Sequence, residues 1–565
     1  MQKRKGVVLA APKSGSGKTL IACALIEALK EAGVNVCAFK CGPDYIDPMF
    51  HRTILGVPGG NLDTYFTGEA KTKEIFMEET PEDAFAVVEG VMGLYDGLGG
   101  IFEEGSTYHL AKAISLPVIL VIDAHGMGRT ILPLIQGLLS YDKAGIIKGV
   151  ILNRVSKMFY ASLKELIETE LSIEVLGCFT EQKELHLESR HLGLKLPEEK
   201  RDLKEQVCRG ADSLKETVSI ERILAIGGAG EKDAASPEVD SHENKVTYQR
   251  ADIYENDMVF QRADIKENDT HESKLRLAIA KDEAFCFYYQ ENLKLLSKRG
   301  FELVPFSPLH DKKLPEHISG LLLGGGYPEL FAKELSENDS MKTAIREAIR
   351  GGLPSLAECG GFLYLHKSLK DMEGRQYSMA GVIDADADYR GKLVRFGYVE
   401  LTEKESCFLP EKEGIRGHEF HYFDSTENGT DCVAKKPTGS RRWECVWEGE
   451  NHWWGFPHLY YPSNPSFAEH FYQQAGLYQQ SKLKQKDKYR IGGRDVRIET
   501  RFHGAHLSGG VERSRQTASG NLPAARRQGE RRDRSREVLV GEGRRQHGLP
   551  GADLPQRRRQ GGSGD

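Results

Sequence analysis

Residues 6–19 read GVVLAAPKSGSGKT, and this stretch decides the fold of the first half of the chain. Its first six residues form an apolar run typical of a buried strand, and a run with helical periodicity follows over residues 19–32. A glycine-rich loop between a strand and a helix binds phosphate, because glycine lets successive backbone N–H groups point at the phosphate oxygens. We therefore predict that ATP is bound by Ser14, Gly15, Ser16, Gly17, Lys18 and Thr19.

Two lysines, Lys13 and Lys18, help to decide which kind of nucleotide-binding loop this is. Lys18 is expected to reach the outer phosphates, while the Thr19 hydroxyl is expected to bind Mg²⁺. Pro12 departs from the strict pattern, which has glycine there. Lys13 stands where dimeric partitioning ATPases carry a signature lysine, so a partitioning-type switch and an ordinary surface lysine both remain open as interpretations.

Four further apolar runs follow the loop, at residues 34–39, 84–89, 117–123 and 149–153. Helix-length segments separate these runs, and such alternation predicts a parallel, doubly wound α/β sheet. We assign residues 1–228 to one ATP-binding domain of this class.

A polar linker is predicted next, at residues 229–273. It contains an internal duplication, YQRADIYEND at 248–257 and FQRADIKEND at 260–269, which is too short for a repeat architecture. A second α/β pattern begins with LRLAIA at residue 275, and we assign residues 274–480 to a second domain.

Composition separates the end of the chain from the rest. The net charge of the whole protein is −6, but residues 481–565 hold 21 Lys and Arg against 10 Asp and Glu. This segment is rich in Arg, Gly and Gln and lacks apolar periodicity, so we predict a disordered basic tail. Such a tail could bind nucleic acid, but we favour a nonfunctional or out-of-frame extension.

No stretch approaches the roughly 18 consecutive apolar residues that a membrane span needs, and the N-terminal residues show no signal-peptide pattern. We therefore expect a cytoplasmic protein without a membrane partner.

The ten cysteines are scattered, without the spacing of structural zinc sites, so we expect neither a disulfide framework nor a structural metal.

Acidic residues follow two of the predicted strands. Glu89 ends the run AFAVVE and should emerge at the carboxyl edge of the sheet beside the phosphate loop, where a carboxylate can hold Mg²⁺. The segment KCGPDYIDPMFH, residues 40–51, follows another strand and places Asp44 and Asp47 around Tyr45. These aspartates could bind magnesium or an acidic substrate, or they could cap a turn and a helix.

Cys359 lies in AECGG, between an apolar run and FLYL, within residues 353–365. This arrangement is a nucleophile elbow, in which glycines permit a strained turn and the start of a helix favours a thiolate and an oxyanion. We predict a glutaminase nucleophile rather than an inert buried cysteine.

A cysteine nucleophile also needs a base. His458 in GFPHLYYPSNP is the preferred candidate over the histidines at 418, 421 and 452. The glycine turn of LLLGGGYPEL, residues 321–330, is suited to form the other wall of an oxyanion hole.

Over about residues 5–475 the chain resembles the cobyrinate a,c-diamide synthase family. The resemblance implies a dethiobiotin-synthetase-like P-loop domain followed by a class I glutamine amidotransferase domain. The most specific motif is KCGPDYIDP, which the related cobyric acid synthases lack. In chain order, the motifs are APKSGSGKT, KCGPDYIDPMFH, NLDTYF, VEGVMGLYDG, RHLGL, LLLGGGYPEL, AECGGFLYL and HLYYPSNP.

The resemblance implies roles for single residues. Cys359 matches the nucleophile and His458 the residue that activates it. Tyr460 stands where most class I glutaminases have the glutamate of a His-x-Glu pair, so this motif lacks the third member of the triad. Four acids match acidic positions that the family has around Mg²⁺, the nucleotide and the acceptor: Asp44, Asp47, Glu89 and Asp96. Tyr45, Asp44, Asp47 and Asp96 are expected to bind the substrate. Thr19, Asp44 and Glu89 are expected to bind the metal.

The implied reaction is ATP- and Mg²⁺-dependent amidation of the a and c carboxylates of cobyrinate in cobalamin synthesis, through acyl phosphates and with ammonia from glutamine. Hydrogenobyrinate and nickel-sirohydrochlorin remain open as acceptors, and a homodimer remains open as the assembly. The alternative of another class is a partitioning-type ATPase switch with a non-catalytic second domain.

Overall fold

The computed structural model describes residues 3–181, 197–229 and 274–491, which lie in one compact unit, Met1–Arg494. The predicted linker duplication, the RHLGL motif and the part of the predicted tail after residue 491 lie outside the described residues. Within the described residues, no helix is long and apolar enough to cross a membrane.

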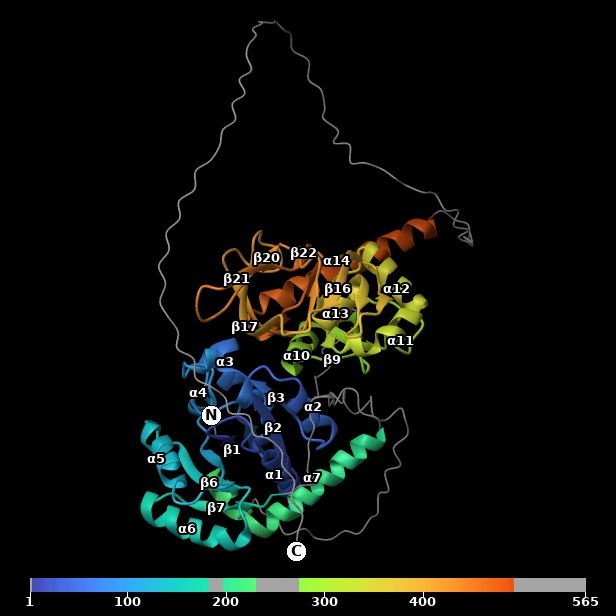
Figure 1. Cartoon of the computed structure of the whole chain (residues 1–565). Coiled ribbons are helices and arrows are strands. Elements are labelled where there is room, and N and C mark those ends of the chain that lie inside the picture. Colours follow the sequence, from blue (N-terminus) through green and yellow to red (C-terminus); the bar gives the residue numbers. More distant parts are fainter. Residues whose placement is uncertain (1–2, 182–196, 230–273, 492–565) are drawn as a thin grey trace, which may run out of the picture. The chain divides into compact units, whose positions relative to one another are not determined.

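A seven-stranded parallel sheet in the order β3-β2-β4-β1-β5-β6-β7 forms the centre of the first domain (Figure 1). Its strands are β1 (Lys5–Ala10), β2 (Val36–Cys41), β3 (Gly59–Leu62), β4 (Phe85–Glu89), β5 (Val118–Asp123), β6 (Ile147–Asn153) and β7 (Val175–Phe179). Its helices are α1 (Lys18–Glu31), α2 (Ile46–Thr53), α3 (Thr64–Glu79), η1 (Leu98–Gly100), α4 (Thr107–Ile114), α5 (Ile131–Tyr141), α6 (Lys157–Leu171), α7 (Pro197–Thr217) and α8 (Ile220–Ile226).

Helices cover both faces of this sheet, which is why its strands are continuous apolar runs. Side chains of β1 alternate between the two layers, since successive residues of a strand point to opposite faces. Val7 and Leu9 pack with α1, α2, α7 and α8, whereas Val8 and Ala10 pack with α3 to α6. Helix α7 lies along α1 (Figure 1).

The second domain has a central sheet in the order β10-β8-β11-β13-β23-β22, parallel except for β22. Its strands are β8 (Leu275–Ala280), β10 (Phe301–Phe306), β11 (Gly320–Leu323), β13 (Ser355–Glu358), β22 (Trp447–Gly449) and β23 (His452–Gly455), and the short strands β9 (Phe285–Phe287) and β12 (Gly325–Gly326) pair with each other. Its helices are α10 (Gln290–Arg299), η5 (Pro328–Phe331), α11 (Ala332–Glu337), α12 (Asp339–Arg350), α13 (Gly360–Leu365), η6 (Tyr461–Ser463) and α14 (Ser466–Ile491).

Two smaller sheets extend the second domain, in the orders β15-β14-β16-β19 and β21-β20-β17-β18-β24. The sequence patterns predicted neither of them. Their strands are β14 (His366–Lys370), β15 (Gln376–Ser378), β16 (Ile383–Tyr389), β17 (Arg395–Glu403), β18 (Gly414–His421), β19 (Phe423–Ser425), β20 (Cys432–Lys435), β21 (Arg442–Cys445) and β24 (His458–Leu459).

The predicted fold class, a P-loop α/β domain followed by a second α/β domain, is confirmed by these sheets. The predicted end of the second domain at residue 480 falls inside α14, which continues to Ile491. Residues 481–491 are therefore helical, which corrects the prediction that they begin a disordered tail.

Candidate active sites

The phosphate loop joins β1 to α1 as predicted. Gly17 has a φ of 91°, and a Cβ there would lie 2.1 Å from Asn153 Nδ2, so this position requires glycine. Asn153 in turn donates to the Ser16 carbonyl oxygen at 2.8 Å. The loop is thus fixed by the end of β6 as well as by its own glycines.

Lys18 is buried and points at one backbone oxygen of the phosphate loop and one of the segment after β4. Its Nζ donates to the Met92 carbonyl oxygen at 2.6 Å and to the Lys13 carbonyl oxygen at 3.4 Å. Burial, followed by the charge of Lys40, lowers the pKa of Lys18 to about 8. Incoming phosphate oxygens would offer this ammonium stronger, charged acceptors than carbonyl oxygens.

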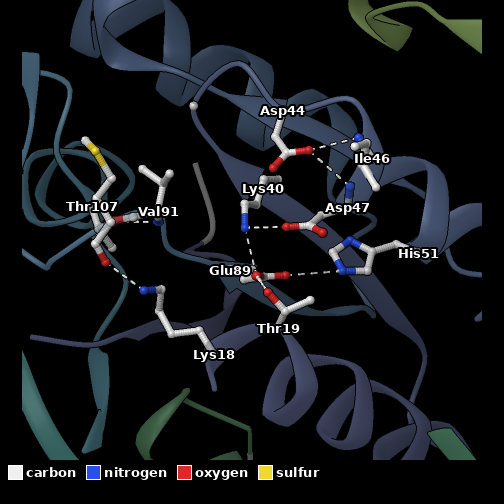
Figure 2. A network of polar contacts seen from close by, with 12 residues as sticks. Lys18, Thr19, Lys40, Asp44, Ile46, Asp47, His51, Glu89, Val91 and Thr107 are labelled. Atoms are coloured by element: carbon white, nitrogen blue, oxygen red, sulfur yellow. Dashed lines mark hydrogen bonds and ion pairs between the residues drawn. The ribbon is translucent and has the colours of Figure 1, made fainter. Parts of the chain in front are cut away.

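A buried network of charges lies beside the loop (Figure 2). Lys40 Nζ lies 2.5 Å from Asp47 Oδ2 and 2.7 Å from Glu89 Oε1, so one ammonium bridges both carboxylates. Thr19 Oγ1 donates to Glu89 Oε1 at 2.5 Å. The structure therefore brings together Thr19, Asp47 and Glu89, three residues that the sequence assigned to this site from distant parts of the chain.

The charges of this network set one another's protonation. Burial disfavours the charged form of Lys40, but Glu89 and Asp47 outweigh it and raise its pKa. Burial likewise opposes ionisation of Glu89, yet Lys40 and His51 hold its pKa well below the usual range. For Asp47, burial and then the charge of Glu89 raise the pKa.

Sequence reasoning did not single out two members of this network. Lys40 is the first residue of the quoted motif KCGPDYIDPMFH, and its place at the end of β2 was the available signal. His51 ends the same motif, and its Nε2 lies 3.6 Å from Glu89 Oε2. No local pattern could reveal that the two side chains converge on Glu89.

Asp44 and Asp96 have structural partners. Asp44 Oδ1 accepts from the backbone N–H groups of Ile46 and Asp47, at 2.8 and 3.2 Å, and so caps α2. Asp96 Oδ2 accepts from the Gly93 N–H at 3.0 Å. Asp44 Oδ1 thus accepts from the first backbone N–H groups of α2, as the turn-and-cap interpretation expects, and the metal and substrate roles of Asp44 and Asp96 stay predictions.

The donor set around Thr19 and Glu89 fits a magnesium ion. Mg²⁺ prefers hydroxyl and carboxylate oxygens. Glu89 Oε2 is buried and within hydrogen-bonding distance of no described donor, and the ring of His51 lies nearest to it, with Nε2 at 3.6 Å.

The second centre surrounds Cys359, which connects β13 to α13. Its backbone has a φ of 47° and a ψ of −100°, a strained conformation typical of a nucleophile elbow. The following glycines are required by space, since a Cβ on Gly361 would lie 2.1 Å from the Leu323 carbonyl oxygen. A Cβ on Gly360 would lie 3.1 Å from the Gly326 nitrogen, so the predicted glycine turn does lie beside the elbow.

The thiol itself is not poised as a thiolate. The sequence predicted that the helix start would favour the ionised form, but burial dominates and raises the pKa of Cys359 above its ordinary value. A neighbouring base is therefore required for the attack.

His458, in β24, is the candidate base. It is buried, and burial, followed by His418 and His421, lowers its pKa to about 3, so the imidazole is neutral in this structure. Its Nδ1 lies 4.0 Å from Glu358 Oε2, and Glu358 Oε1 accepts from the Tyr461 hydroxyl at 2.9 Å. Glu358 immediately precedes the nucleophile, and sequence reasoning missed it although AECGG contains it.

The two centres meet at Tyr45. Its half-buried ring lies 5.1 Å from the ring of His458, 5.2 Å from Phe287 and 4.4 Å from Tyr289, measured between centroids. Tyr45 belongs to the acid-bearing loop of the first domain, whereas the other three rings belong to the second. The residue predicted to touch substrate thus contacts the candidate base.

Comparison with known proteins agrees with this arrangement. Residues 7–194 match the CobQ/CobB/MinD/ParA nucleotide binding domain, and residues 276–451 match the CobB/CobQ-like glutamine amidotransferase domain. Two proteins named cobyrinate a,c-diamide synthase are similar to this chain. The one from Caldanaerobacter subterraneus subsp. tengcongensis is 38% identical to it, and the one from Picrophilus torridus is 36% identical. They cover 80% and 83% of this chain, which in turn covers 94% and 98% of them.

The chain belongs to the cobyrinate a,c-diamide synthase family. It is accordingly an enzyme, a ligase of the glutamine amidotransferase type with a nucleotide-binding domain that uses ATP. Membership in this family decides against the partitioning switch with a non-catalytic second domain.

The charge network yields a prediction for stability. Replacing Lys40 by methionine leaves two buried carboxylates without their shared cation, so the free energy of unfolding should fall by about 3 kcal/mol. Urea unfolding followed by circular dichroism measures this. Lys71→Met, which removes an exposed ion pair with Glu74, is the control and should change stability by less than about 0.5 kcal/mol. Equal effects of the two substitutions would contradict the role of Lys40.

Proposed function

We propose that this protein amidates the a and c side-chain carboxylates of cobyrinate, with ATP activating each carboxylate and glutamine supplying ammonia. The observation that carries the proposal is the contact between Tyr45 and His458, because it joins the acid-bearing loop of one domain to the candidate base of the other. The name shared by the relatives supports cobyrinate as the acceptor.

In the first step, an oxygen of the acceptor carboxylate attacks the γ-phosphorus of ATP. The bond from that phosphorus to the bridging oxygen breaks, which yields an acyl phosphate and ADP. Lys18 leaves its carbonyl partners to stabilise the charge on the phosphates. Thr19, Glu89 and Asp47 would hold Mg²⁺, which neutralises phosphate charge when bound. We assign Asp47 rather than Asp44 to this set, because Lys40 bridges Asp47 to Glu89, whereas Asp44 Oδ1 accepts from the first N–H groups of α2.

In the second centre, Cys359 Sγ attacks the amide carbon of glutamine while His458 takes the thiol proton. Backbone N–H groups at Gly326 and Gly360 stabilise the oxyanion. His458 then returns the proton to the leaving nitrogen, ammonia departs, and water hydrolyses the thioester to glutamate.

Glu358 orients His458 in this proposal. The usual carboxylate two residues after the histidine is replaced by Tyr460, whereas Glu358 lies 4.0 Å from His458 Nδ1. Burial raises the pKa of Glu358 to about 8, and a positive charge on His458 would lower it again. The distance of 4.0 Å is longer than a hydrogen bond, but catalytic hydrogen bonds commonly shorten when substrate binds.

Ammonia must reach the acyl phosphate without release, since in water it is mostly protonated and unreactive. Tyr45 lies between the two centres, because it is two residues from Asp47 in the chain and its ring contacts His458. Polar contacts hold the two domains around it: Tyr398 donates to Asp63 Oδ2 at 2.7 Å, and the Asn61 N–H donates to Glu291 at 3.0 Å.

The acceptor is tested by supplying ATP, Mg²⁺ and glutamine together with cobyrinate, hydrogenobyrinate or nickel-sirohydrochlorin in parallel. We expect mass spectrometry to show two added amides on cobyrinate. Two amides on one of the other acceptors only would replace cobyrinate with that acceptor.

The division of labour gives a second prediction. Cys359→Ala should abolish amidation with glutamine but retain amidation with ammonium salts, because the first domain is untouched. Lys18→Ala should abolish both, since activation of the carboxylate requires it. Loss of both activities in Cys359→Ala would refute two separable centres.

The orienting role of Glu358 gives a third. Glu358→Gln should lower kcat with glutamine about 100-fold at unchanged KM for glutamine, and ammonia-dependent amidation should persist. The control is Glu448→Gln, a glutamate of the same domain whose pKa burial also raises, to about 9, and which contacts Cys432 instead. If Glu358→Gln behaves like this control, His458 works without Glu358.

A further inference from the structure

Large aromatic side chains are exposed on one hairpin of the second domain. Phe396 of β17 is 60% exposed, Phe420 of β18 is 50% exposed and Tyr422 just after β18 is 40% exposed. Phe396 and Phe420 are register partners, and the ring centroids of Phe396–Phe420 and Phe420–Tyr422 are each 5.7 Å apart. We call these three side chains the aromatic face. Burying them against a flat apolar ligand would be favourable.

The aromatic face continues to the loop at residues 42–47 of the first domain, which holds Asp44 and Asp47 and which we call the acceptor loop. Tyr398 and His418 share the side of the hairpin with Phe396 and Phe420, because alternate residues of a strand point the same way. The Tyr398 hydroxyl lies 3.5 Å from where a Cβ on Gly42 would be, and Gly42 begins the turn that leads to Asp44 and Asp47. A ligand on the exposed end of this hairpin therefore lies beside the predicted acceptor site.

Cations line the neighbouring edge of the same sheet. Arg395, Lys436 and Arg441 gather around the ring of Trp443, at 4.4, 5.6 and 5.6 Å from its centroid, and we call them the cationic edge. Lys436 Nζ donates to the carbonyl oxygens of Phe396, Gly397 and Tyr398, which ties the cationic edge to the backbone of β17. Arg395 points to the opposite face of the hairpin from its neighbour Phe396, so the cations border the aromatic face only at the edge of the sheet. Glu419 is the acid that interacts with all three cations, which leaves an excess of positive charge.

The cationic edge also approaches the first domain. A Cβ on Gly99 would lie 3.4 Å from Thr438 Oγ1, in the turn that follows Lys436. Gly99 comes shortly after Asp96, one of the acids expected near the substrate. Aromatic face, cationic edge and acceptor loop thus border one another.

We propose that the aromatic face and the cationic edge bind the ring of the acceptor, a large planar macrocycle with several carboxylates. The ring stacks on Phe396 and Phe420, and a carboxylate at its rim that is not being amidated pairs with Arg441, the exposed member of the cationic edge. The reacting carboxylate then points to the loop around Asp47. This inference rests on the proposed function, and it assigns the binding surface for that acceptor.

The test is equilibrium dialysis of cobyrinate, followed by the absorbance of the macrocycle, on the full chain and its variants. Phe396→Ala and Phe420→Ala should each raise the Kd about tenfold, whereas Phe396→Tyr should bind like the parent protein. The KM values for ATP and glutamine should not change. Met372→Ala, which removes a 54% exposed side chain elsewhere in the same domain, is the matched control.

The cationic edge is tested by Arg441→Gln, because this exposed side chain can be changed without disturbing the core. Its Kd should rise severalfold at low salt, and the difference from the parent protein should vanish as salt is added.

Unchanged Kd values in both phenylalanine variants would overturn the proposal. Sedimentation would overturn it too, if these variants dissociate a dimer while the Kd for cobyrinate stays the same, because the face would then join two copies of the chain. Binding of cobyrinate without formation of amides would refute the proposed function and leave this surface as a macrocycle site. Weak binding to the parent protein itself would refute the surface.

Discussion

The ammonium of Lys40, held between Asp47 and Glu89, is the interaction on which the first centre depends. Two buried carboxylates this close would repel each other without a shared cation. Lys40 therefore allows β2, α2 and β4 to bring both acids beside Thr19. The same compensation keeps both carboxylates in place next to the phosphate loop, where we propose that Mg²⁺ binds.

The segment that starts at Lys40 serves both centres. Asp44 fixes the beginning of α2, so that Asp47 turns toward the charge network while Tyr45 turns toward His458. The two candidate centres thus approach each other over a few residues of one turn. The aromatic face of β17 and β18 approaches the same turn through Tyr398. An acceptor bound on that face would therefore lie next to this turn.

Local rules found the parts of each centre that a short segment contains. The phosphate loop was predicted because glycine spacing and its place between strand and helix are written in adjacent residues, and Cys359 for the same reason. Lys40, His51 and Glu358 were missed although each lies inside a quoted motif, because their partners come from other strands. The helix start at Cys359 suggested a thiolate, whereas burial, which depends on the whole domain, keeps the thiol protonated.

By itself the sequence determined two α/β domains, a phosphate loop and an elbow cysteine, because backbone conformation and apolar periodicity are properties of neighbouring residues. Tertiary structure alone decided which acid shares a cation with which, that Glu358 rather than a residue after His458 faces the imidazole, and that Tyr45 joins the two centres. It also decided that Phe396 and Phe420 lie exposed beside the acceptor loop. Distances between side chains far apart in the chain, and the burial that sets their charge, exist only once the sheets have formed.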